Sequence, residues 1–63
     1  MKDKDYHYNI IDNALKSYEE NKVYHRFTIS WITDRIDWCW KFRKITEDQL
    51  EELTNRVINV LKK

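Results

Sequence analysis

The fold of this chain depends on one stretch, TISWITDRIDWCWKFR, at residues 28–43. Read as two strands, this stretch places apolar side chains at nearly every second position of each strand. Read as a helix, it places them on two adjacent stripes and leaves a polar arc on the other side. The first stripe contains Ile29, Ile32, Ile36, Cys39 and Trp40, and the second contains Trp31, Trp38 and Phe42.

The turn that a strand pair would need separates these two readings. A hairpin would have to reverse at residues 33–35, TDR, and the chain contains no Gly to supply the positive φ that tight hairpins favour. A helix needs only an N-cap, which Thr28 can supply. We therefore predict a helix over residues 28–43. The alternative is a two-stranded hairpin with strands at 24–33 and 36–44.

The clearest helical pattern covers residues 46–62. Thr46 and Gln49 have the spacing of a capping box, and Ile45 and Leu50 have that of a hydrophobic staple. We expect this helix to pack against the helix before it as a helical hairpin with a tight corner. The stripe expected to be buried contains Leu50, Leu53, Val57, Val60 and Leu61.

Residues 6–21 form the third predicted helix. At about 100° per residue, its apolar side chains share one arc and its charged side chains lie opposite. The apolar arc contains His7, Tyr8, Ile11, Ala14, Leu15 and Tyr18. Residues 22–27 are a connector, and we expect residues 1–5 to fray. The sequence thus predicts an all-α fold, a compact three-helix unit in a single small domain over residues 1–63, with an α+β helix–hairpin–helix as the alternative.

Length and composition exclude several classes of protein. The chain has 63 residues, 12 basic and 11 acidic side chains, a net charge of +1 and one Cys. A chain this short buries only roughly 60% of its unfolded surface, which leaves little scaffold for a deep catalytic pocket. One Cys cannot form an internal disulfide, and no apolar run approaches the roughly 20 residues of a membrane span. We expect a cytoplasmic protein that has no signal peptide, no membrane partner and no enzymatic activity.

Amino-acid usage bears on the origin of the gene. Lys, Ile, Asn, Tyr, Phe and Met, whose codons are AT-rich, number 27. Gly, Ala, Arg and Pro, whose codons are GC-rich, number 5. This bias indicates an AT-rich bacterial genome, or a phage or mobile element that lives in one.

The middle helix carries a wide apolar surface. Its two stripes together span about 200°, more than either flanking helix. One reading places the second stripe in the core, because a middle helix touches two neighbours. The other makes it an interface with another copy or a target protein, because monomers rarely expose several hundred Å² of apolar surface. Both readings stay open, and because small domains often oligomerise to complete their cores, we expect a homodimer. The interface residues would be Trp31, Arg35, Trp38 and Phe42.

Few residues suit catalysis or metal binding. His7, His25 and Cys39 are the soft-ligand candidates, but their spacings of 18 and 14 residues and their number do not match a structural zinc site. A Cys39 nucleophile with His25 as its base would lack an orienting third group. The acidic residues of the last helix fit helix-start electrostatics and a solvated face. We expect no cofactor, no metal and no catalytic residue.

Basic and aromatic side chains alternate at residues 40–44, WKFRK. Such interleaving is one form of nucleic-acid contact, which here would come from Lys41, Arg43 and Lys44. Against this, two Asp residues lie on the same helix face as Lys41, where they would repel phosphate. We therefore do not expect nucleic acid to be the main partner.

These observations predict a small non-enzymatic protein-binding module. On this interpretation it is encoded by a phage or mobile element and acts as a homodimer in the host cytoplasm. It would bind and inhibit a host protein, such as a component of a bacterial defence system. The alternative is a small DNA- or RNA-binding accessory regulator that uses the basic corner at residues 40–44.

Overall fold

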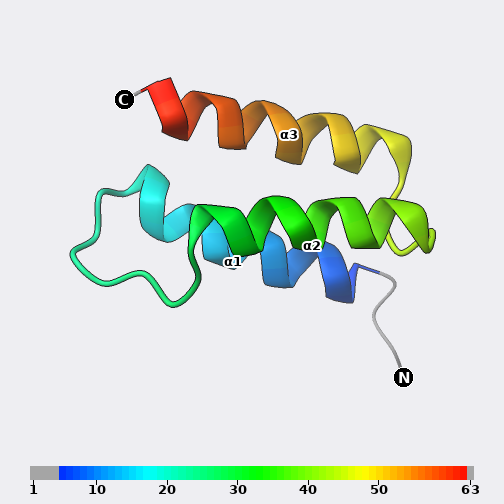
Figure 1. The fold of residues 1–63 in the computed structure, drawn as a ribbon, viewed down its shortest axis with the longest axis horizontal. Helices are drawn as coiled ribbons and strands as arrows, with labels where there is room; N and C mark the ends of the chain where they lie inside the picture. The colour runs from blue at the N-terminus through cyan, green and yellow to red at the C-terminus, as the bar shows by residue number, and fades with distance from the viewer. Residues whose placement is uncertain (1–4, 63) are drawn as a thin grey trace.

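The computed structural model describes residues 5–62 as three α-helices. In chain order they are α1 (Tyr6–Glu19), α2 (Ile29–Lys41) and α3 (Glu47–Lys62). Consecutive helices run in opposite directions, and each helix contacts the other two (Figure 1). The described part of the chain is therefore a three-helix bundle with one α2–α3 helical hairpin.

The all-α prediction is confirmed, and every predicted helix end lies within two residues of the observed one. The alternative strands at 24–33 and 36–44 are wrong, because the described residues contain no strand. Residues 33–35, where the hairpin would have reversed, lie inside α2. The missing turn chemistry was therefore the right reason to favour a helix.

Asp5 holds the start of α1. Its backbone oxygen accepts a hydrogen bond from the Asn9 N–H at 2.8 Å. Its Oδ1 accepts another from Nε2 of Gln49, in the first turn of α3, at 3.0 Å. Of the residues expected to fray, 1–4 lie outside the described residues, whereas Asp5 connects α1 to α3.

Side-chain caps start α2 and α3 where the sequence predicts them. Thr28 has an extended backbone, and its Oγ1 accepts from the Trp31 N–H at 3.0 Å. Thr46 Oγ1 accepts from the Gln49 N–H at 3.1 Å, and Gln49 Oε1 accepts from the Thr46 N–H at 3.0 Å. The N-cap and the capping box are therefore confirmed. Ile45, ahead of the box, is buried in the core as a hydrophobic staple requires.

α1 and α2 end in the same backbone motif. Asn21 and Arg43 follow the two helices with left-handed φ angles of 56° and 60°. In each case the next N–H donates to the carbonyl five residues earlier, at 2.9 Å after α1 and 2.7 Å after α2. This is the Schellman motif, in which Gly usually takes the left-handed position. Asn tolerates that conformation, whereas the Cβ of Arg43 adds a steric cost of about 1 kcal/mol.

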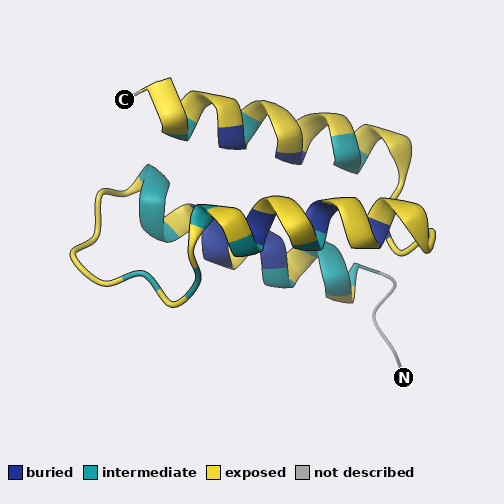
Figure 2. Ribbon diagram, viewed as in Figure 1, coloured by how far each residue is buried: buried dark blue, intermediate teal, exposed yellow. Residues whose placement is uncertain are grey.

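The core lies where the inner faces of the three helices meet (Figure 2). Its buried residues are Ile11, Ala14, Leu15, Ile32, Ile36, Cys39, Ile45, Leu53 and Val57. The burial predicted for Leu61 is wrong, because Leu61 is 64% exposed, and Trp40, which shares a stripe with buried residues of α2, is 36% exposed. Trp40 lies at the edge of the α2 stripe. Leu61 lies in the last turn of α3, which extends past the first turn of α2 (Figure 1).

The loop between α1 and α2 is fixed to α1. The His25 ring stacks on Tyr18 at 3.8 Å between centroids, and its Nδ1 lies 2.9 Å from Ser17 Oγ. The hydroxyl of Tyr18 donates to the Phe27 carbonyl at 2.6 Å. Because Ser17 Oγ donates its single proton to the Ala14 carbonyl, Nδ1 of His25 is the donor of their bond. These contacts place Phe27 at the start of α2.

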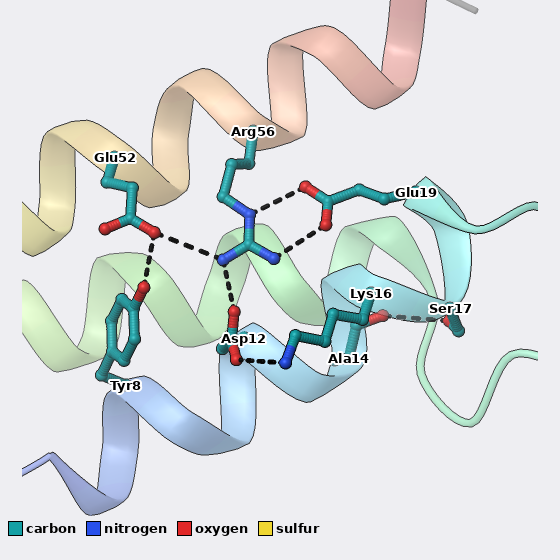
Figure 3. A network of polar contacts seen from close by, with 8 residues as sticks. All are labelled: Tyr8, Asp12, Ala14, Lys16, Ser17, Glu19, Glu52 and Arg56. Atoms are coloured by element: carbon teal, nitrogen blue, oxygen red, sulfur yellow. Dashed lines mark hydrogen bonds and ion pairs between the residues drawn. The ribbon is translucent and has the colours of Figure 1, made fainter.

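A cluster of ion pairs joins α1 to α3 (Figure 3). The Arg56 guanidinium forms two hydrogen bonds of 2.8 Å with Glu19 and one of 2.6 Å with Asp12. Glu52, one turn earlier on α3, lies 3.4 Å from Arg56 and accepts a hydrogen bond from the Tyr8 hydroxyl. We call these five residues the Arg56 cluster. It aligns the outer edges of α1 and α3 over the core.

The pKa values of the Arg56 cluster reflect its hydrogen bonds. Hydrogen bonding to Glu19 is the main reason that the pKa of Arg56 is raised, although burial alone would lower it. The hydrogen bond from Tyr8 to Glu52 raises the pKa of Tyr8 to about 12, with burial adding to the effect. Tyr8 therefore stays protonated and keeps donating at neutral pH.

Candidate protein-binding surface

One face of α2 carries a row of aromatic side chains around a single arginine. We call Phe27, Trp31, Arg35, Trp38 and Phe42 the aromatic row. The last four are spaced by three or four residues, which places them on one side of the helix, and Phe27, which precedes the helix, stacks on Trp31. The core residues of α2 lie on a different side. The sequence predicted four of these residues as an interface, and the structure brings all four together.

The rings of the aromatic row pack in two pairs. Phe27 stacks on Trp31 with centroids 3.9 Å apart and planes 14° apart. Trp38 contacts Phe42 with centroids 5.1 Å apart. The guanidinium carbon of Arg35 lies between the pairs, 5.1 Å from the Trp31 ring and 5.2 Å from the Trp38 ring. The row is therefore an ordered surface, held by ring stacking and cation–π contacts.

The aromatic row remains partly exposed although the core beneath it is complete. Trp38 is 38% exposed and Phe42 is 55% exposed. His7, at the start of α1, covers one side of Trp38 with centroids 5.8 Å apart. Tyr6 lies edge-on to His7 and is itself 53% exposed. Because α1 begins here, the described chain has no more helix to cover this end of the row.

The charges at the centre of the row have no ionic partner within residues 5–62. Arg35 makes its cation–π contacts there but no hydrogen bond or ion pair. Asp34, next to it, is exposed and likewise forms neither a hydrogen bond nor an ion pair through its side chain with the described residues. Both line a shallow hollow between Trp31 and Trp38. The face thus presents a fixed cation and an anion between two indole rings.

An open hollow lies at one end of the row and an exposed ring at the other. The hollow has a volume of about 420 Å³ and lies between α1 and the loop that ends at Phe27. It is lined by Ile10, Asn13, Ala14, Tyr24, Arg26 and Phe27, among others. At the opposite end of the row, Phe42 projects with more than half of its surface exposed.

Sequence reasoning missed Phe27 and His7 as members of this surface. Phe27 was assigned to a connector and His7 to the apolar arc of its helix. The available signal for Phe27 was its position four residues before Trp31, which continues the same helical face. The contact between His7 and Trp38 depends on how α1 docks on α2, and no local pattern reports that arrangement.

The basic corner has a different geometry. Lys41 is the last residue of α2 and is exposed. Arg43 takes the left-handed position after α2 and lies 5.8 Å from the ring of Trp40. The Lys44 backbone N–H closes the end of α2. The residues predicted to contact nucleic acid thus lie around the C-terminal end of α2, where their backbones form the corner before α3. They are Lys41, Arg43 and Lys44.

The other candidate chemistries receive little geometric support. Cys39 is buried, and desolvation raises the pKa of its thiol, which keeps it in the unreactive protonated form. No group of three or more His, Cys, Asp or Glu side chains in residues 5–62 is placed to hold a metal ion. Within the same residues, no helix has the length and apolar character of a membrane span.

Comparisons of the chain with protein-family models, with curated proteins and with solved structures find no match. The function proposed next therefore rests on the residues of this chain and on their geometry.

Proposed function

We propose that this chain is a small non-enzymatic protein-binding module, that it acts as a homodimer, and that the aromatic row is its binding surface. The supporting observation is the row itself, in which two Trp rings lie around Arg35 and in which Trp38 and Phe42 are exposed while Phe27 and Trp31 are partly buried against the core. Trp and Arg are the side chains most enriched among residues that dominate binding energy at protein interfaces. An apolar surface of this kind is uncommon on a protein that has no partner.

We further propose that the chain is encoded by a phage or mobile element and inhibits a bacterial host protein, such as a component of a defence system. The support is the short length of the chain, its near-neutral charge and its AT-rich amino-acid usage. The module would act in the host cytoplasm, where its single buried Cys needs no oxidising environment.

Nucleic-acid binding is the second candidate, because Arg43 stacks on the exposed Trp40 at the basic corner. A net charge of +1 weakens this candidate, and so do Asp34 and Asp37, which form no ion pair within residues 5–62, because phosphate binding depends on accumulated positive charge. The two candidates depend on different indole rings of α2, Trp38 in the aromatic row and Trp40 at the basic corner. They can therefore be separated by substitution.

Trp38 and Trp40 provide a matched test. They are 38% and 36% exposed and lie on opposite sides of the same helix. We expect Trp38→Ala to abolish self-association in sedimentation equilibrium and to reduce recovery of a bacterial protein in a pull-down. Trp40→Ala should leave both measurements unchanged. Equal behaviour of the two variants would contradict the assignment of the binding surface to the aromatic row.

A salt titration separates the two candidates independently. If duplex or single-stranded DNA binds through several phosphate contacts, its affinity should fall by about a thousandfold between 50 and 200 mM salt. A protein partner held by apolar burial should change little over that range. Micromolar DNA binding at physiological salt that disappears in Lys41→Glu/Arg43→Glu would favour the regulator instead.

A further inference from the structure

The aromatic row is symmetric about its own centre. Phe27 and Phe42 lie equally far along the chain from the midpoint between residues 34 and 35, and so do Trp31 and Trp38. The contacts repeat this order, because each Trp packs against the outer Phe on its own side. Arg35 lies at nearly equal distances from the two indole rings.

We propose that a second copy of this chain covers the row with its own row, with the two α2 helices antiparallel about a twofold axis near residues 34 and 35. This inference rests on the proposed homodimer, and it adds which face is used and in which orientation. The axis brings Trp31 against the partner's Trp38 and Phe27 against the partner's Phe42. A twofold interface requires such self-complementary pairs.

The two ends of the row favour the antiparallel orientation. Phe42 projects at one end, and the apolar hollow beside Phe27 lies open at the other. Antiparallel packing inserts the Phe42 ring of each copy into the hollow beside the partner's Phe27, so that both hollows are filled. Parallel packing would instead place the two Phe42 rings together at one end and leave both hollows empty.

The charges near the axis are self-complementary as well. Each copy contributes one Asp34 and one Arg35, and neither side chain is ionically paired within the described residues of its own chain. Two carboxylates and two guanidiniums therefore lie around the axis, and their charges sum to zero. Desolvated Arg–carboxylate contacts of this kind fix the register of an interface and exclude wrong partners.

A dimer interface of standard size would cover a limited part of the surface of this chain. The surface area of the described chain is 4922 Å². A standard interface buries about 800 Å² per partner, which is about one sixth of that area. At the rim, the same symmetry places Arg26 opposite the partner's Arg43. Both are exposed, and salt screens their repulsion.

Charge substitutions on the two central residues test the pairing. Asp34→Arg leaves four cations around the axis, and Arg35→Asp leaves four anions. We expect each variant alone to dimerise at least tenfold more weakly than the unmodified protein in sedimentation equilibrium. An equimolar mixture of the two should form a heterodimer at least as tight as the unmodified dimer. The matched control is Asp37→Arg, which has the same charge change as Asp34→Arg but lies off the row and should dimerise normally.

Cross-linking tests the orientation. Arg26→Cys and Arg43→Cys place thiols at two exposed positions, while Cys39 is buried and unreactive. A bismaleimide reagent should link the two variants to each other in a mixture, and neither variant to itself. Links within each variant alone would instead show a parallel dimer and overturn the orientation.

Three further results would overturn the inference. They are a monomeric unmodified protein at high micromolar concentration, failure of the Asp34→Arg and Arg35→Asp mixture to associate, and equal weakening by Asp37→Arg. If the unmodified protein dimerises, Trp38→Ala abolishes the dimer and the charge variants have no effect, the proposed function stands and this twofold arrangement fails. Circular dichroism of each variant confirms that its helices remain folded.

Discussion

Two arginines of this small bundle differ in what surrounds their guanidinium groups. Arg56, in the seam between α1 and α3, has a side chain that is only 17% exposed and is bonded to three carboxylates of its own chain. Arg35, on the aromatic row of α2, touches two indole rings and no carboxylate within residues 5–62. Arg56 therefore stabilises the fold, whereas the guanidinium N–H groups of Arg35 form no hydrogen bond with the described residues and stay available to a partner.

The carboxylates show the same division. Asp12 and Glu19 meet Arg56, and Asp12 is also 3.3 Å from Lys16. Asp34 and Asp37 form no ion pair within the described residues of α2 and its neighbours. The carboxylates that pair with Arg56 and Lys16 inside the chain are less available to bind a partner. Of Asp34 and Asp37, only Asp34 lies beside Arg35 in the hollow between Trp31 and Trp38.

Arg56→Ala should give the largest effect on stability. It removes the cation that Asp12, Glu19 and Glu52 share, and it leaves Asp12 with Lys16. We expect a loss of about 3 kcal/mol in the free energy of unfolding, because removing one partner of a partly buried ionic cluster strands the others. A domain of this size has few kcal/mol in total, so the variant should be largely unfolded at 37 °C in a circular dichroism melt.

Arg56→Lys is the matched control for this prediction. It keeps the positive charge but loses the planar fork that bonds Glu19 through two nitrogens. Its melting temperature should lie between those of the unmodified protein and Arg56→Ala. Identical melts for all three proteins would show that the cluster adds nothing to stability, and the comparison with Arg35 would lose its basis.

Thr46→Ala should have the next largest effect. The Thr46 side chain accepts from the Gln49 N–H at the start of α3, and that N–H loses its partner in the variant. We expect a loss of about 0.5–2 kcal/mol, measured by urea unfolding. Thr46→Ser keeps the hydroxyl and should unfold close to the unmodified protein. Superimposed curves for Thr46→Ala would contradict the capping box.

Arg35→Gln should change the stability of the isolated chain less than Arg56→Ala or Thr46→Ala does. Only cation–π contacts at a partly exposed site are lost, which corresponds to about 0.5–1 kcal/mol. Its effect on self-association should be much larger. Sedimentation equilibrium measures self-association, and a melt at dilute concentration measures the stability of the isolated chain. A destabilisation as large as that of Arg56→Ala would show that Arg35 holds the fold, which would remove the contrast between the two arginines.

Sequence reasoning recovered the parts of the fold that local patterns determine. The N-cap at Thr28 and the capping box at Thr46 lie where predicted, because each depends on residues within one turn. The Arg56 cluster was not predicted, because it joins residues 37 and 44 positions apart. Its available signals were the seven-residue spacing of Asp12 and Glu19 on one helix face and the Glu52–Arg56 step. Neither shows how α1 docks on α3.

The candidate surface was predicted only in part, for a related reason. Helical spacing groups Trp31, Trp38 and Phe42 on one face without stating which faces the neighbouring helices cover. Trp40 shows the same limit, because by angle it shares a stripe with buried residues of α2 but is 36% exposed at the edge of that stripe. Coverage depends on helix lengths and crossing geometry, which only the assembled bundle defines.

The smallest expected effect is a pH dependence that belongs to the Arg56 cluster and has no counterpart on the aromatic row. The hydrogen bond to Glu52 raises the pKa of Tyr8 from 10.0 to about 12 in the folded protein. Between pH 10 and 12 the folded state therefore holds a proton that the unfolded state has released. The stabilisation is complete below pH 10 and is lost as the pH rises through 12. Urea unfolding at several pH values should show stability falling more steeply for the unmodified protein than for Tyr8→Phe in this window. Tyr24→Phe, which changes an exposed loop phenol, should retain the full slope, and equal slopes for all three proteins would show that the Tyr8 hydroxyl does not donate to Glu52.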